Sequence, residues 1–465
     1  MTRFFRLIKN EYIKLFSKVG TYVLLGVLVL SVVAAAAISL TRSNEDSYAS
    51  SREQSYQHEA DYYKETRQEN YEAYVEHYSY LAEKQIPYYD WRTAAMDHLL
   101  KVRIELCEFK KDPEASKERI ESREQYLDEA MAVIETGTWR EFFEQALEWT
   151  ESLELPAEEA ERQTSLFNTI LQYDLEPVEN NELYTLARTM ADQRQEMKAL
   201  EADGNQNSEK EKRYQTLQEE IALAQYRLDH GLETIVQGSN TYWGSPDFWF
   251  VMDTVLSMVV LISVVMIIIG GSILSSEFSG GTIKFLLINP VKRSKIFLSK
   301  YVTVLSMGLG CVMLYYLLAV LVTGCFYGFG GAGAPYLFIG AGSRVVEIPG
   351  LLFLAYKFLL ASVGVIVMST LAFAISSLFK NTAVSVAVSV AALLGGNTLV
   401  GVLKQNFGFD WARFLLFANL DLNAVINEQT LFTGLTVTFA LVVIAVHLVV
   451  FFLTAWDGFV RRRSI

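Results

Sequence analysis

A short stretch between two apolar runs, SSEFSGGTIKFLLINPVKRSKIFLSK, contains residue types that suit ionic docking. Its acidic residue, Glu277, stands among five basic residues. Gly280 and Gly281 allow a sharp turn of the backbone, Thr282 can cap a short helix, and Pro290 would end that helix. We therefore predict a docking loop over residues 275–300.

The basic residues of this loop have two interpretations. They serve membrane topology, since Lys and Arg accumulate in cytoplasmic loops. They also suit contact with anionic lipid headgroups or acidic patches of a partner protein, which we expect of Arg293, Lys295 and Lys300. Topology alone explains the positive charge but not Glu277 or the turn residues. We expect Glu277 to pair with a basic residue of the partner.

Two ionisable residues fall inside apolar runs, where charged groups are costly and usually functional. Asp253 and Lys357 are both expected near the outer ends of their spans, about two turns in for Asp253. They either pair with each other, or Asp253 lines a wet cavity, or both lie at headgroup depth with Lys357 snorkelling.

Other chemistry is not indicated by the motifs. The chain contains no Gly-x-x-x-x-Gly-Lys-Ser/Thr phosphate loop, so ATP binding of that kind would need a separate polypeptide. His58, His77, His98 and His230 lack metal-ligand spacing, and exposed helix positions are expected for them. We predict no catalytic, cofactor-binding or metal-binding residue on this chain, and no enzyme activity of its own.

Six apolar runs are long enough to cross a bilayer, which needs about 20 residues. In short loops, Lys and Arg concentrate on one side, which places both termini and the docking loop in the cytoplasm. The predicted spans are Tyr22–Leu40, Phe248–Leu274, Tyr301–Phe326, Leu351–Leu378, Val384–Leu403 and Leu431–Trp456.

Residues 2–18, TRFFRLIKNEYIKLFSK, place apolar and basic residues at helical spacing. This pattern predicts an amphipathic helix lying on the inner leaflet. The alternative is a basic tail that only fixes topology.

Residues 41–247 form an acidic insert between the first two spans. They contain 22 Lys+Arg and 45 Asp+Glu, a net charge of 22 − 45 = −23, against −13 for the whole chain. Scarce proline and apolar stripes at spacings of 3 and 4 predict an all-helical domain, with an antiparallel hairpin over residues 183–236. Its many tyrosines either pack inside or bind a cationic amphipathic peptide. The acidic total argues against nucleic-acid binding.

The loop resembles the one between the second and third spans of ABC-2 type permeases, the membrane subunits of one class of bacterial ATP-binding-cassette transporters. The predicted helix before the first span is similar to the elbow helix of that family. The matching loop residues are Glu277, Gly281, Thr282, Lys284, Leu287, Pro290, Arg293 and Lys300.

This resemblance implies an all-α membrane protein with six transmembrane helices and an amphipathic elbow helix. The residue pattern of the insert adds an all-helical extracellular domain. The domains would be 1–40, 41–247 and 248–465. The resemblance implies contact of Glu277 and the following Gly-Thr with an ABC ATPase subunit that binds ATP and Mg. It also implies a second permease chain, identical or not. The large insert departs from the family's usual short first outer loop.

The expected function is a permease in a bacterial plasma membrane, exporting a peptide, a lipid-linked precursor or a hydrophobic antibiotic. Resistance to antimicrobial peptides would be one outcome of such export. The alternative is a membrane-anchored sensor, whose extracellular domain detects a peptide or cell-wall ligand. Co-purification of an ATPase would discriminate between the two.

Overall fold

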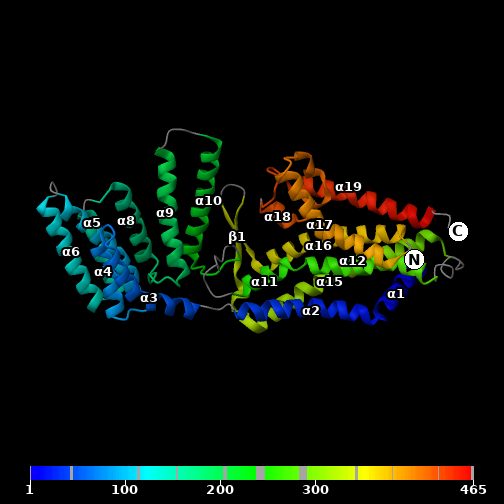
Figure 1. Ribbon diagram of the computed structural model, residues 1–465, viewed down its shortest axis with the longest axis horizontal. Coiled ribbons are helices and arrows are strands. Elements are labelled where there is room, and N and C mark those ends of the chain that lie inside the picture. Colours follow the sequence, from blue (N-terminus) through cyan, green and yellow to red (C-terminus); the bar gives the residue numbers. More distant parts are fainter. Residues whose placement is uncertain are drawn as a thin grey trace. The chain divides into compact units, whose positions relative to one another are not determined.

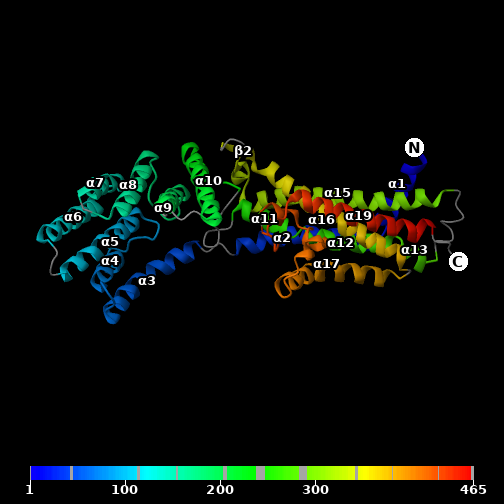
Figure 2. The same ribbon diagram turned by 90° about the horizontal axis from the view of Figure 1, so that it is seen from above.

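The computed structural model describes residues 2–41, 45–112, 116–152, 155–202, 207–236, 247–281, 291–340, 344–379, 381–427 and 429–461 (Figures 1 and 2). The chain divides into two compact units. The membrane unit comprises Met1–Arg42, Pro246–Gly333 and Gly350–Ile465. The helical domain comprises Ser43–Ser245 and Ala334–Pro349.

The membrane unit contains six apolar helical segments of membrane-spanning length among the described residues, which confirms the predicted number. The second is broken into three pieces, and a π-helical turn, Asp457–Arg461, extends the last. The segments are α2 (Val19–Leu40), α11–α13 (Phe248–Ser257, Val260–Ile273, Ser275–Ser279), α15 (Arg293–Tyr327), α16 (Gly350–Leu378), α17 (Thr382–Gln405) and α19 (Val437–Trp456).

Two boundaries differ most from the prediction: hydropathy misses the polar start of the third span and includes apolar residues that precede the sixth. The third span begins at Arg293 rather than Tyr301, so the basic end of the predicted loop is helical. The sixth begins at Val437, not Leu431. Thr436 caps it by accepting from the amide of Phe439.

Helix α16 is central to the membrane unit and packs against α12, α15, α17 and α19. Small residues bring α12 close, since a Cβ atom on Gly270 would lie 3.1 Å from the carbonyl oxygen of Ser369. Between α17 and α19 lie two 3-10 turns (Asp410–Phe414, Leu416–Ala418) and α18 (Leu422–Ile426). They bury Leu416, Leu422 and Val425 against α16 and α19.

The insert is helical, as predicted. Asn207 caps the second helix of the predicted hairpin by accepting from the amides of Glu209 and Lys210. The helices are α3 (Glu45–Thr66), α4 (Tyr71–Glu83), α5 (Trp91–Lys111), α6 (Lys117–Thr136), α7 (Trp139–Ser152), α8 (Ala157–Gln172), α9 (Glu182–Ala202) and α10 (Ser208–His230).

The tyrosines follow the plainer of the two interpretations. Tyr56 is 5% exposed, and Tyr63 stacks on Tyr74 and Tyr78 at 4.5 and 5.9 Å between ring centroids. The histidine expectation is wrong for His98, whose ring packs against Phe142 and Phe167, and for His77, which is 2% exposed in the core between α4 and α5. Its Nδ1 lies 3.2 Å from the carbonyl oxygen of Met96, and burial lowers its pKa to about 4.

The protein is mostly helical, as predicted, with one strand pair that the sequence did not indicate. Strands β1 (Pro335–Ile339) and β2 (Val345–Pro349) form an antiparallel pair that belongs to the helical domain. The amide of Val236 donates to the carbonyl of Pro335 at 3.0 Å, and the Tyr226 hydroxyl lies 3.2 Å from Glu347 Oε2. The sequences of β1 (PYLFI) and β2 (VVEIP) contain β-branched and aromatic residues, which suit strands. The domain therefore includes a segment between α15 and α16 as well as the insert.

Candidate functional site

A buried lysine lies at the centre of an ionic cluster in the membrane unit. Lys300, on the second turn of α15, is 1% exposed. Its Nζ lies 2.8 Å from Glu11 Oε2 and 3.1 Å from Glu277 Oε1. Glu11 belongs to α1 (Thr2–Phe16) and Glu277 to α13. One ammonium group on α15 therefore joins α13, nearby in the sequence, to α1, whose Glu11 is 289 residues away.

Lys14 completes the cluster from its outer side. Its Nζ lies 3.1 Å from Glu277 Oε1 and 4.0 Å from Glu11 Oε1, and its side chain is 53% exposed. Two carboxylates and two ammonium groups cancel in charge. Such cancellation is needed because a buried charge without a partner is very costly. We call Glu11, Lys14, Glu277 and Lys300 the ionic cluster.

The N-terminal helix is held so that Glu11 and Lys14 face the other members. These two residues are three apart and so share one face of α1. The Tyr12 hydroxyl lies 2.7 Å from Ser306 Oγ on α15. The Thr21 hydroxyl donates to the carbonyl of Leu15 at 2.7 Å and fixes the bend into α2.

Helix α13 is bonded to two further spans. The amides of Leu274 and Ser275 donate to Ser376 Oγ of α16 at 3.2 and 2.9 Å. The Ser275 hydroxyl donates to Thr382 Oγ1 of α17 at 3.1 Å. Ser275 and Ser376 are fully buried. This short helix therefore links the ionic cluster to the packed spans.

The structure places part of the predicted docking loop. Gly281 has a φ of +68°, so the sharp turn after the second span occurs there. Arg293 is the first residue of α15. Thr282, Lys284 and Pro290 lie outside the described residues.

Glu277 and Lys300 have different surroundings from those expected from the sequence. Glu277 is bonded within its own chain, and Lys300, expected at a lipid or protein surface, is buried. The signal missed was Glu11, the single acidic residue in an otherwise basic helical segment. A lone acid in a basic amphipathic helix needs a specific partner, but the sequence does not say which one.

Asp253 of α11 and Lys357 of α16 are brought together, as in one of the predicted alternatives. Lys357 Nζ lies 3.6 Å from Asp253 Oδ1 and 5.3 Å from the ring centroid of Phe353. The Asp253 side chain is 73% exposed and that of Lys357 21%. The side-chain amide of Asn423 donates through Nδ2 to the backbone carbonyl of Lys357 at 3.2 Å.

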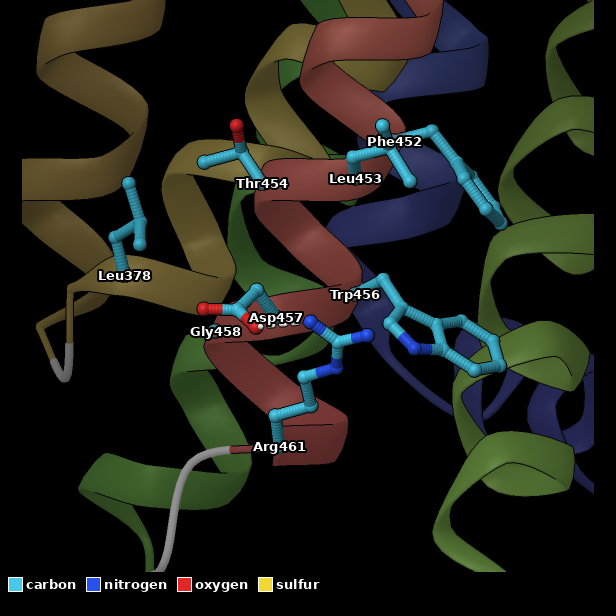
Figure 3. A pocket seen from close by; sticks show the side chains of 8 residues that line it. All are labelled: Leu378, Phe452, Leu453, Thr454, Trp456, Asp457, Gly458 and Arg461. Carbon is cyan, nitrogen blue, oxygen red and sulfur yellow. Dashed lines mark ion pairs between the residues drawn. The ribbon is translucent and has the colours of Figure 1, made fainter.

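A hollow of about 890 Å³ lies beside the end of α19. Figure 3 shows Asp457 and Arg461 together on the last turn, with Trp456 on the opposite side of the helix from Leu378. Arg461 Nη1 lies 3.5 Å from Asp457 Oδ1. The Trp456 ring lies 5.3 Å from that of Phe297, one turn before Lys300 on α15. The first turns of α15 therefore contact both the ionic cluster and the C-terminal helix.

No group of three or more potential metal-ligating side chains occurs among the residues that the structure describes. The geometry offers ion pairing and mechanical linkage.

Comparison with known proteins identifies relatives of the membrane unit. The family described as "protein of unknown function (DUF2705)" matches residues 237–463. "Uncharacterized protein YhcI" of Bacillus subtilis is 34% identical over 245 residues, covering 52% of this chain and 75% of YhcI. "Uncharacterized membrane protein YdbK" of the same organism is 36% identical over 207 residues, covering 44% and 79%. No solved structure matches.

Proposed function

We propose that this chain, which belongs to the same protein family as YhcI and YdbK of Bacillus subtilis, is the permease subunit of an ABC-2 type transporter. It would work in a bacterial plasma membrane with both termini in the cytoplasm and the helical domain outside. A separate ATPase subunit would bind ATP and Mg, since the chain has no phosphate loop. Export of a peptide, a lipid-linked molecule or a hydrophobic antibiotic is the reaction that we favour.

The ionic cluster is the observation that carries the proposal. A permease must convert movement of a docked ATPase into movement of its spans. Glu277 and Lys300 flank the segment proposed to dock, and they are bonded to the N-terminal helix through Lys14 and Glu11, respectively. Through Ser376 and Thr382, the same region is bonded to α16 and α17. A push on the docking loop would therefore reach four helices at once.

The second permease chain of the proposed assembly would cover α17. Asn397, in the second half of that span, has an exposed side chain, and Leu394, three residues earlier on the same face, is 68% exposed. An amide facing hydrocarbon without a partner is costly. Contact with a second chain, or with a polar pathway between two chains, would satisfy it.

The test is co-expression with the ATPase subunit encoded beside the gene, followed by purification and measurement of ATP hydrolysis. We expect a stable complex, and loss of ATPase stimulation in the double variant Glu277→Ala, Arg293→Ala. The matched control is Lys9→Ala, an exposed basic residue of α1 outside the ionic cluster. Absence of a complex with every candidate ATPase would contradict the proposal and favour the sensor.

A further inference from the structure

The helical domain contains a cavity of about 390 Å³ between α8, α9 and α10, helices that lie next to one another in Figure 1. This volume falls within the range of about 300–1,000 Å³ that is usual for small-molecule sites. The proposed transport function assigns no role to this cavity, and the inference below does not rest on that function.

The cavity exists because α9 contributes small side chains, while polar contacts hold the neighbouring helices at a fixed distance from it. Ala191, Ala199 and Ala202 line it from α9. Gln193 Nε2 donates to Glu220 Oε2 of α10 at 2.7 Å, which fixes the distance between these helices. Met197 and Ile221 complete an apolar lining.

The basic side chains that line the cavity differ in whether a carboxylate is paired with them. Arg162 lies 3.3 Å from Glu159 and 3.1 Å from Asp192, and Lys198 is paired with Glu161. Among the residues that the structure describes, the hydrogen-bond partners of Arg194 are neutral: Ser165 Oγ at 3.1 Å and Gln225 Oε1 at 3.0 Å.

Among the described residues, Arg194 makes no ion pair with a carboxylate. In a domain with 45 acidic and 22 basic residues over positions 41–247, an arginine without an acidic partner is unexpected. Because it lines an apolar cavity, its charge is available to a ligand. A guanidinium matches the geometry of carboxylate and phosphate groups.

Two acidic residues, Glu158 and Glu161, also line the cavity. Glu158 lies exposed in the first turn of α8. It is seven residues, about 10 Å of helix, from Ser165, which Arg194 contacts. The Glu158 carboxylate therefore lies at the other end of the α8 lining from Ser165.

We infer that the cavity binds a single-chain amphiphile with an anionic head, either a fatty acid or an alkyl phosphate. The chain would lie against Ala199, Met197 and Ile221, and the anionic group would receive hydrogen bonds from Arg194. The site combines apolar side chains with a guanidinium group that can fix orientation, as small-ligand sites usually do.

The test uses the full-length chain in phosphatidylcholine nanodiscs and a dodecanoate that carries a diazirine near its methyl end. After illumination, labelled peptides are identified by mass spectrometry. We expect labelling on residues 191–202 and around Ile221, displaced by dodecanoate or dodecyl phosphate but not by dodecyltrimethylammonium. Whichever anion displaces the label better identifies the headgroup.

Three variants sharpen the test. Arg194→Gln should weaken displacement by about ten- to hundredfold, since a hydrogen bond to a charged group is lost. Ala199→Trp should abolish labelling by filling the cavity, with Ala199→Leu as a smaller filler if the Trp variant loses helical content. Arg213→Gln, on the exposed side of α10 and paired with Glu196 at 2.8 Å, is the matched control and should change nothing.

Equal displacement by the cationic chain would overturn the inference. So would labelling that persists when folded Ala199 variants fill the cavity, or labelling confined to the membrane spans.

Discussion

The membrane unit and the helical domain bury charge in different ways. The helical domain buries Arg103 and Arg123, but their partners reach in from outside: the Glu76 side chain is 66% exposed and that of Glu105 28%. The ionic cluster instead buries both signs, with Lys300 1%, Glu11 9% and Glu277 11% exposed. A half-exposed carboxylate can rehydrate if its partner is lost, whereas a buried one cannot. Damage to the ionic cluster should therefore have the larger effect.

Replacing Lys300 by Met should have the largest effect of the changes considered. Two carboxylates would remain buried with only Lys14 nearby, and breaking a buried ion pair in this way costs about 3–5 kcal/mol. We expect α1 to detach from α13 and α15. Hydrogen exchange of residues 2–16 in the detergent-solubilised chain measures this, as a loss of amide protection.

Lys295→Met is the matched control, because Lys295 is exposed on the same helix. The triple variant Glu11→Gln, Glu277→Gln, Lys300→Met should recover much of the protection by removing the buried negative charges. Unchanged exchange in Lys300→Met would mean that the ionic cluster does not hold α1.

His77 tests the helical domain, where a titratable group is buried neutral. Its pKa falls from the usual 6.5 to about 4, mainly through burial. The unfolded chain therefore binds this proton between pH 6.5 and 4 while the folded chain does not. The contribution of this group to the free energy of unfolding is fully present above pH 6.5. It is lost as the pH falls towards 4, and the total loss is about 3 kcal/mol.

The measurement is hydrogen exchange of α4 and α5 at several pH values, corrected for intrinsic exchange rates. His77→Gln should flatten the dependence of the local opening free energy on pH between 6.5 and 4. The control is His58→Gln, an exposed histidine of α3. Equal slopes in wild type and His77→Gln would show that His77 is protonated without cost.

Asn397 tests the contrast between the two units with an exposed polar residue in place of a buried charge. An exposed asparagine is ordinary in the helical domain but costly on a membrane span, so we expect a partner chain to cover it. Asn397→Leu should weaken association of two chains by about 1–2 kcal/mol. Disulfide cross-linking between single cysteines introduced by Leu394→Cys, on the same face as Asn397, measures it, with Val446→Cys on the exposed face of α19 as control. Equal cross-linking at both positions would argue against a specific contact.

The sequence predicted the features that depend on local pattern. Long apolar runs must be helical in a bilayer, because each backbone group needs a partner, and six such helices are found. Stripes at spacings of 3 and 4 likewise placed the hairpin of α9 and α10. The extension of α15 to Arg293 escaped hydropathy, because polar residues can continue a helix beyond its apolar part.

Features that depend on residues far apart in the chain were not predicted. Lys300 is 289 residues from Glu11, and nothing local shows that a lysine beside an apolar run will be buried. The strands β1 and β2 join the helical domain through Val236 and Tyr226, about 100 residues or more earlier. The proximity of Asp253 and Lys357 was available only as one of several alternatives, since two isolated ionisable residues do not specify a pairing.

The pair of Asp253 and Lys357 should contribute least of the interactions considered. Although its atoms are only 3.6 Å apart, the Asp253 carboxylate is 73% exposed, and water replaces most of what the ammonium group provides. Exposed ion pairs are worth about 0.2–1 kcal/mol, so Asp253→Asn should leave the unfolding midpoint nearly unchanged. A double-mutant cycle with Lys357→Met, measured in detergent at low and high salt, gives the coupling. A coupling free energy as large as that at Lys300 would show that the membrane shields the Asp253 carboxylate from water.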